Sequence, residues 1–232
     1  MEDIGLESAK IINNYTLEET IAKDLFEGKT YPWEVLPEIG EFIKKLGPTL
    51  DKEIFEERKD FGENIWIAKS VTIAKTATIN GPLIIDENTE VRPGAFIRGN
   101  AIVGKDSVVG NSTELKNVVL FNHVQVPHYN YVGDSVLGFY SHMGAGSITS
   151  NVKSDKTLVV VKSKTENEEI ETGLKKFGAM LGDHVEVGCN SVLNPGTVLC
   201  TDVNIYPTSC VRGVIPAHSI YKNADNIAKK NN

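Results

Sequence analysis

Aliphatic residues recur at every sixth position along much of this 232-residue chain, and this period constrains the fold more than any other feature. An α-helix repeats every 3.6 residues and a strand every two, so neither gives a period of six. A parallel β-helix of triangular cross-section does, because each flat side takes one hexad and three hexads make one coil. The unbroken series is Ile67, Ile73, Ile79, Ile85, Val91, Ile97, Val103, Val109 and Leu115.

The period continues with slips, stops, and then resumes. The later positions are Leu120, Val126, Val132, Leu137 and Met143, followed by Leu181, Val187, Leu193, Leu199, Ile205 and Val211. We therefore predict a mainly β fold, a β-helix over residues 63–222 with an inserted loop at 152–176 and a polar C-terminal tail at 223–232. Loops inserted on a rigid repeat scaffold are where sites usually form.

Residues 1–62 have helical rather than hexad spacing. The segment TLEETIAKDLFEG begins with a capping box, Thr16 with Glu19, and places its apolar residues on one face. A second helix is predicted over Pro32–Gly47, with Trp33 in its core. We expect this part to form a small N-terminal helical cap.

Composition narrows the classes of partner. The formal charge is -7 and the pI is near 5.3, without a cluster of Lys and Arg, which argues against nucleic acid. Cys189, Cys200 and Cys210 form no CxxC pair, so we expect free thiols in a reducing cytosol. The sequence has no apolar run of about 18 residues and no secretory signal pattern. A soluble, cytoplasmic protein without a membrane partner is expected.

Three histidines lie close together in the sequence: His123, His128 and His142. One use for them is metal. The spacing His123-x4-His128 is similar to a ligand pair of the γ-class carbonic anhydrases, which share the coil architecture and bind zinc between subunits through three histidines. The third ligand would come about two coils earlier, where the sequence DENTE has no histidine. We therefore expect no metal.

The other use is acyl transfer to an amine. This reaction needs a base that works near pH 7, which an imidazole supplies, and backbone N–H groups that hold the oxyanion. Gly144-Ala145-Gly146 follows His128 by about one coil, and its small residues let a ligand approach the backbone. Arg92 and Lys116 are expected on preceding coils near His128, where they would meet a phosphate group.

Several motifs resemble one family. The runs EVRPGAFIRGN, NSTELKNVVL, VPHYNYVGDSVLG and GAGSITSN resemble the acetyltransferase domain of the bacterial bifunctional N-acetylglucosamine-1-phosphate uridyltransferase/glucosamine-1-phosphate acetyltransferase. The stretch ETGLKKFGAMLGDHVEVGCNSVLNPGTVL is similar to the corresponding domain of archaeal sugar-1-phosphate nucleotidylyltransferases. The resemblance covers about residues 65 to 215. It implies a left-handed β-helix that acetylates glucosamine-1-phosphate or galactosamine-1-phosphate with acetyl-CoA, a step of UDP-N-acetylglucosamine biosynthesis.

The resemblance also implies roles for single residues. His128 would be the base that activates the sugar amine, Asn151 would orient this amine, and the Ala145 amide would face the thioester oxygen. The remaining implied residues contact the two substrates: Arg92, Lys116 and Tyr131 the sugar phosphate, Glu114 a sugar hydroxyl, Cys189 and the backbone near Pro207 acetyl-CoA, and Lys153 or Lys156 the phosphates of coenzyme A.

Two departures from the family change these expectations. Val152 replaces the tyrosine that follows Asn151 in the bacterial family, and His142 replaces an asparagine one coil back, so the sugar pocket differs. The nucleotidyltransferase half is missing, because no GxGxRLxPxTxxxPK-like opening precedes the coils. We therefore expect no uridyl transfer. The resemblance further implies a homotrimer with acetyl-CoA sites between subunits.

Three functions follow from this sequence. The leading one is an acetyl-CoA-dependent N-acetyltransferase that acts on an amino-sugar 1-phosphate. The first alternative is a non-catalytic homologue that binds a sugar phosphate or nucleotide sugar, which the residues Val152 and His142 and the missing half would explain. The second alternative is a metalloprotein like the γ-class carbonic anhydrases.

Overall fold

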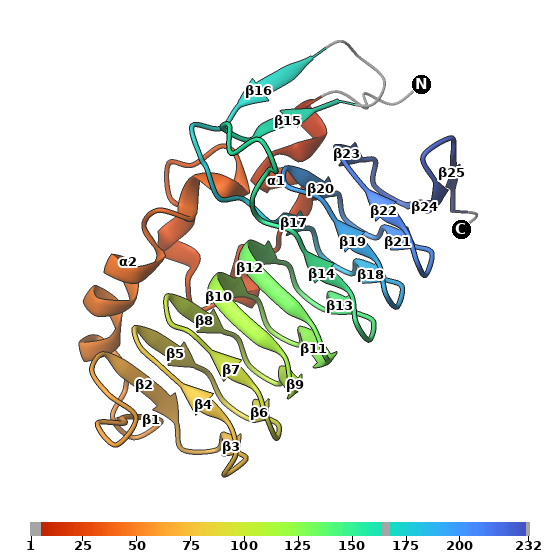
Figure 1. Ribbon diagram of the computed structural model, residues 1–232. Coiled ribbons are helices and arrows are strands. Elements are labelled where there is room, and N and C mark those ends of the chain that lie inside the picture. The colour runs from red at the N-terminus through yellow and green to blue at the C-terminus, as the bar shows by residue number, and fades with distance from the viewer. Residues whose placement is uncertain (1–5, 164–167, 231–232) are drawn as a thin grey trace.

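The polypeptide winds into a parallel β-helix with three flat sides, and an N-terminal segment covers one of them (Figure 1). The computed structural model describes residues 6–163 and 168–230. The chain visits the sides in a fixed order, here called A, B and C, and then returns to side A one coil further on. The predicted left-handed β-helix of hexapeptide repeats is confirmed.

Short strands at the same position of successive coils form each side, and β10 and β12 each turn a corner from side C to side A. Side A consists of β2 (Ile65–Ala68), β5 (Leu83–Ile85), β8 (Ala101–Val103), the ends of β10 (Glu114–Leu120) and β12 (Tyr131–Leu137), β17 (Ala179–Leu181), β20 (Thr197–Leu199) and β23 (Val214–Ile215). Side B consists of β3 (Thr72–Ile73), β6 (Glu90–Val91), β9 (Val108–Asn111), β11 (Gln125–His128), β13 (His142–Met143), β18 (Glu186–Val187), β21 (Asn204–Ile205) and β24 (Ser219–Asn223). Side C consists of β4 (Thr78–Ile79), β7 (Phe96–Ile97), the starts of β10 and β12, β14 (Ile148–Thr149), β19 (Val192–Leu193) and β22 (Cys210–Val211).

The pairing register explains the period in the sequence. Ile67 pairs with Ile85, 18 residues later, whereas Leu120 pairs with Leu137, 17 residues later. The shorter coils produce the slips. The hexad residues point inward, and those from Ile79 onward are buried in one continuous core. Because each coil contacts only its neighbours, this core is built coil by coil.

The corners between sides impose a backbone requirement. Asn100, Asn117 and Asp134 occupy the same position in successive coils at the corner between sides C and A, with φ of 49°, 55° and 49°. These values lie in the left-handed region, which Asn and Asp tolerate better than other non-glycine residues. The alignment of corner residues from different coils is what assembles the site described below.

The inserted segment leaves and rejoins the solenoid at this same C/A corner. It contains a hairpin of antiparallel strands, β15 (Val160–Lys162) and β16 (Glu169–Glu171), which projects from the coils (Figure 1). Strands β12 and β17 on either side of the insertion pair directly, Leu137 with Leu181. The predicted loop insertion is therefore confirmed, and it leaves the stacking of the coils intact.

Residues 6–50, called the strap below, lie along side A and run opposite to the order of the coils (Figure 1). The strap contains η1 (Leu6–Ala9), α1 (Ile11–Asn14), η2 (Leu17–Glu19), η3 (Lys23–Phe26), η4 (Pro32–Val35), α2 (Ile39–Leu46) and η5 (Gly47–Thr49). Its start bonds to a late coil, where the Asn14 side chain accepts the N–H of Thr201 at 2.9 Å. Its end packs on early coils, since α2 contacts β5, β8 and β10.

The helix predicted from Thr16 to Gly28 is wrong. This stretch contains only the short 3-10 helices η2 and η3, and the Thr16 side chain makes no capping bond. The N–H of Thr16 instead donates to Asp183 at 2.8 Å. The second predicted helix is interrupted before α2, at Pro37, because proline disfavours a helical conformation in the residue before it.

The solenoid is capped at both ends by antiparallel strands. Strand β1 (Phe55–Glu57) pairs with β2 of the first coil, and β25 (Asn226–Lys229) pairs with β24 of the last. Each cap occupies backbone groups that would otherwise remain open at the edge of a sheet.

Candidate active site

The predicted catalytic residues lie along the corner between sides B and C. Backbone hydrogen bonds connect the turns of successive coils there, from Tyr129 to Asn111, from Gly146 to His128, from Asn190 to Ala145, and from Thr208 to Cys189, at 2.8–3.0 Å. We call this line of turns the B/C column. It brings His128, Ala145, Cys189 and Pro207 onto consecutive coils. Neighbouring coils lie about 4.8 Å apart, so about 14 Å separates the first of these turns from the last.

His128 ends β11 and is exposed. Its backbone is fixed on both sides, because its carbonyl accepts the Gly146 N–H at 3.0 Å and its N–H donates to Asn130 Oδ1 at 3.1 Å. The Asn130 amide in turn donates to the carbonyls of Gly144 and Ser147. Among the described residues, none makes a hydrogen bond to the His128 imidazole. The ring is therefore held by its backbone and available to a substrate.

Ala145 lies one coil beyond His128. Its carbonyl accepts the Asn190 N–H at 2.9 Å, whereas no acceptor for its own N–H is found in the described part of the chain. Gly146 has a φ of 72°, and a Cβ there would lie 2.3 Å from Asn190 Oδ1, so this turn requires glycine. The turn thus presents an N–H group that can stabilise an oxyanion.

A second group of polar residues gathers at the C/A corner around Asp134. This carboxylate is only 3% exposed. It accepts hydrogen bonds from Lys116 Nζ at 2.9 and 3.1 Å, from Asn117 Nδ2 at 3.0 Å and from Asn151 Nδ2 at 2.6 Å. The sequence motifs did not single out Asp134. It joins two residues of the predicted substrate site, Lys116 and Asn151, into one network.

Tyr131 belongs to this network, since its hydroxyl accepts a hydrogen bond from Asn151 Nδ2 at 3.1 Å. Partial burial raises the pKa of Tyr131, and the negative charges of Asp134 and Glu114 add to the effect. The phenol therefore stays protonated at neutral pH. Its own proton remains available to donate to a ligand.

The cations of the predicted phosphate site are divided between corners. Arg92 lies on the B/C column two coils before His128 and pairs with Glu90 at 2.9 Å. Arg98, which the sequence motifs did not single out, lies one coil before Lys116 at the C/A corner and pairs with Glu114 at 2.7 Å. A spacing of 18 residues from Lys116, one full coil, could have identified Arg98.

The three neighbouring histidines do not form a cluster. His123 lies at the corner between sides A and B, where its ring stacks on Tyr140 with centroids 4.4 Å apart. His142 lies on side B and bonds to Glu186 at 2.8 Å. Five extended residues separate His123 from His128, a span of about 16 Å. Within residues 6–163 and 168–230, no three His, Cys, Asp or Glu side chains gather as metal ligands.

The insertion adds a cavity of about 680 Å³ against the later coils at the C/A corner. Lys153 lines this cavity together with Lys162 and Arg212. Lys153 lies 3.5 Å from Asp155, whereas Lys156 is exposed outside the cavity. Of the two lysines predicted to contact coenzyme A, only Lys153 thus faces an enclosed space.

Comparison with known proteins gives the family. Residues 79–228 match the family described as GMPPB C-terminal domain. The chain belongs to this family. In the part that the structure describes, no helix of this GMPPB C-terminal domain protein is long and apolar enough to cross a membrane.

Curated relatives carry the names that the motifs predicted. A bifunctional protein GlmU from Methanococcus maripaludis is 34% identical over 187 residues, which cover 81% of this chain and 44% of the relative. A bifunctional sugar-1-phosphate nucleotidylyltransferase/acetyltransferase from Sulfurisphaera tokodaii is 36% identical over 100 residues, 43% of this chain and 24% of the relative. The chain thus spans less than half the length of these relatives.

Solved structures of lower similarity include AntD, an N-acyltransferase from Bacillus cereus in complex with dTDP and coenzyme A. It is 17% identical, with a TM-score of 0.44 over 76% of this chain and 91% of that chain.

Proposed function

We propose that this protein is an acyltransferase that moves the acetyl group of acetyl-CoA to the amine of an amino-sugar 1-phosphate. The B/C column is the observation that carries the proposal. It holds an available imidazole, an N–H group without an acceptor and two further predicted contact residues on consecutive coils. The GlmU relatives support the acyltransferase class.

The reaction can be followed through the residues of the column. The His128 imidazole accepts a proton from the sugar amine as the nitrogen attacks the thioester carbonyl. The Ala145 N–H donates to the oxyanion that forms. When the carbon–sulfur bond breaks, the imidazolium returns the proton to the departing thiolate. The products are an N-acetylated sugar phosphate and coenzyme A, and His128 is regenerated.

The charges at the C/A corner refine the assignment of the phosphate contact. Lys116 is largely buried and bound to Asp134 through both carboxylate oxygens, so its charge is already matched. The pair between Arg98 and Glu114 is more exposed, and exposed ion pairs contribute little stability. Arg98 can therefore exchange its partner for a phosphate at small cost. We assign it as the phosphate contact, with Lys116 and Asn151 held in place by Asp134.

A thiol-release assay tests the proposal. Acetyl-CoA is offered with glucosamine-1-phosphate, galactosamine-1-phosphate or the free amino sugars. Release should require a 1-phosphate, and His128→Ala should lower kcat about 10²- to 10⁴-fold. His184→Ala, which removes another exposed imidazole at the A/B corner, is the matched control and should keep full activity. Full activity in His128→Ala would overturn the assignment of the base.

The position of His142 favours a second candidate, a non-catalytic homologue that binds a sugar phosphate or nucleotide sugar. His142 replaces the asparagine of the bacterial family and is bound to Glu186 on side B. If the acceptor panel gives no release but a sugar phosphate still binds, this second function is the correct one.

We also propose a homotrimer that acts in the cytoplasm. The strap covers side A, whereas the B/C column is open and presents exposed aromatic residues such as Tyr129 and Tyr206. Subunits that meet beside this column would enclose the acetyl-CoA site, and closed cyclic assemblies are common among homo-oligomers. Light scattering on the purified protein should give three times the chain mass of 25.4 kDa.

A further inference from the structure

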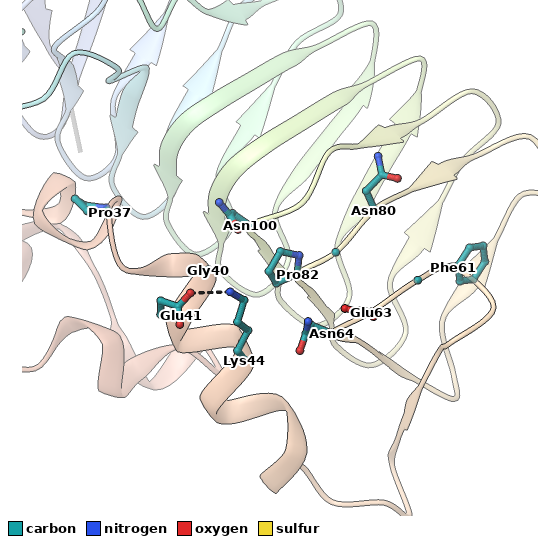
Figure 2. A pocket seen from close by; sticks show the side chains of 12 residues that line it. Pro37, Gly40, Glu41, Lys44, Phe61, Glu63, Asn64, Asn80, Pro82 and Asn100 are labelled. Carbon is teal, nitrogen blue, oxygen red and sulfur yellow. Dashed lines mark hydrogen bonds and ion pairs between the residues drawn. The ribbon is translucent and has the colours of Figure 1, made fainter.

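A cavity of about 570 Å³ opens beside the first coils, apart from the B/C column. Figure 2 shows Glu41 and Lys44 of α2 on one side of it and Asn64, Asn80 and Asn100 of the coils on the other. Neither the sequence motifs nor the proposed reaction uses this cavity. Its volume lies in the range typical of small-molecule sites.

Three side-chain amides of this cavity have no protein partner. Among the described residues, none makes a hydrogen bond to the side chain of Asn64, Asn80 or Asn100. Asparagines further along the solenoid differ: Asn117 and Asn151 each donate two side-chain hydrogen bonds. A partly buried amide that makes no protein contact has its full hydrogen-bonding capacity left for a ligand.

Backbone geometry accounts for only two of these asparagines. Asn64 and Asn100 have φ of 57° and 49°, so the left-handed corner favours asparagine there. Asn80 is not among the left-handed residues, and the corresponding positions of the next two coils are Arg98 and Lys116. The backbone therefore does not require an amide at position 80.

The charges around the cavity select the kind of ligand. Lys44 is paired with Glu41 at 2.7 Å, and Glu63 adds a further negative charge, so the lining is net negative. An anionic group such as a phosphate is disfavoured. Side-chain amides both donate and accept hydrogen bonds, as hydroxyl groups do, and Phe61 adds an apolar surface.

We propose that this cavity binds a neutral carbohydrate, a mono- or disaccharide, separately from the reaction centre. Gly40 and Gly81 leave the two walls without side chains. A Cβ at Gly40 would lie 2.6 Å from Asn100 Oδ1, and one at Gly81 would lie 2.2 Å from the Glu63 carbonyl oxygen. Both walls are thus built from closely packed backbone, which holds the amides in fixed positions.

Saturation-transfer NMR on the full chain tests this site with four probes: methyl α-glucoside, methyl α-mannoside, N-acetylglucosamine and maltose. We expect saturation transfer to at least one sugar, and at least tenfold weaker binding of it by the double variant Asn80→Ala/Asn100→Gly. Glycine at position 100 removes the amide but permits the positive φ, which avoids backbone strain. Thermal melts verify that the variant folds.

The matched control is Asn88→Gly/Asn204→Ala. Asn88 is an exposed corner residue with a φ of 57°, and Asn204 lies on side B, both outside the cavity. This control and His128→Ala should bind the sugar like the wild type, whatever the outcome of the thiol-release assay. Absence of saturation transfer to all four probes would overturn the proposal, and so would equal binding by the Asn80→Ala/Asn100→Gly variant.

Discussion

Asp134 shows how one buried carboxylate can organise residues from three coils. Its partners Lys116, Asn117 and Asn151 are distant in sequence and reach it only because each coil returns the chain to the same corner. The carboxylate is almost fully removed from water, so its hydrogen bonds and its cation must offset the cost of burial.

Replacement of Asp134 by asparagine should therefore affect both folding and binding. Lys116 would be left largely buried without a counter-charge, which should destabilise the protein by about 3 kcal/mol. The KM for the sugar phosphate should rise more than kcat falls, because Lys116 and Asn151 lose their anchor. Urea unfolding and steady-state kinetics measure the two effects.

Asp183→Asn is the control for this prediction. Asp183 is also a buried corner carboxylate, but it accepts backbone N–H groups of Thr16 and Phe139. Its replacement should lower stability and leave KM unchanged. Equal changes of KM in both variants would mean that Asp134 acts only through the fold.

Asp86 makes a pH-dependent prediction. This residue is 2% exposed, and burial raises its pKa. The folded state therefore binds the proton more tightly than the unfolded state, and Asp86 costs stability as the pH rises from the ordinary carboxyl range through its raised pKa. Asp86→Asn should be more stable than the wild type at neutral pH, by on the order of 1 kcal/mol.

This gain should disappear in acid, where Asp86 is protonated in both states. Thermal melts from pH 3 to pH 8 measure the difference. Asp24→Asn, at an exposed position of η3, should change stability little at any pH. A gain for Asp86→Asn that is constant over this range would contradict the explanation.

Single residues were predictable from the sequence where a motif named them, and not where only coil geometry joins them. The GAGSITSN and VPHYNYVGDSVLG motifs identified His128 and Ala145 with their correct one-coil relation. Asp134 and Arg98 were missed because their partners lie 17 or 18 residues away, which no local pattern displays. The histidines misled for the opposite reason, since neighbours in sequence lie at different corners.

At the scale of elements, the strap depends on aromatic packing. Trp33 of η4 is 2% exposed, stacks on Tyr31 with centroids 4.6 Å apart, and meets Phe177 at the end of the insertion at 5.6 Å. Trp33→Ala should destabilise the protein by about 3 to 5 kcal/mol, because it opens a cavity where strap, coil and insertion meet. Urea unfolding followed by circular dichroism measures the loss. Trp33→Phe should recover at least half of it, and equal losses in both variants would exclude the cavity as the cause.

The coils could be predicted from their own sequence, whereas the strap could not. Hexads repeat inside each coil, so every element confirms the next. The short helices of the strap are shaped by burial against side A rather than by helical propensity, which is why the capping box at Thr16 misled. One pattern did announce the strap: runs of three apolar residues recur on side A alone, as in Leu83–Ile85 and Val118–Leu120, and they leave no polar outer face.

At the scale of the whole molecule, the strap connects coils that otherwise contact only their neighbours. A solenoid alone can unfold in parts. Because the strap extends from Thr201 to the first coil, we expect the wild type to unfold in one transition, with equal urea midpoints by circular dichroism and by fluorescence of Trp66, which lies in the first coil.

Asn14→Ala should separate these two midpoints. It removes the acceptor of the Thr201 N–H and releases the strap from the late coils. The late coils should then unfold at lower urea, which circular dichroism detects, while Trp66 fluorescence changes later. Asn13→Ala, whose side chain bonds only within the strap, is the control and should keep one transition. Two midpoints in the wild type would show that the strap does not couple the coils.

The reversed direction of the strap also sets an order of events during synthesis. Coils can stack as they emerge from the ribosome, since each needs only the coil before it. The N–H of Thr16 must wait for Asp183, 167 residues later, before it finds its acceptor. Side A of the nascent solenoid therefore stays without its complete cover until translation is nearly finished. The growing chain is most exposed to chaperones and to aggregation during this interval, and its first residues are among the last to reach their native place.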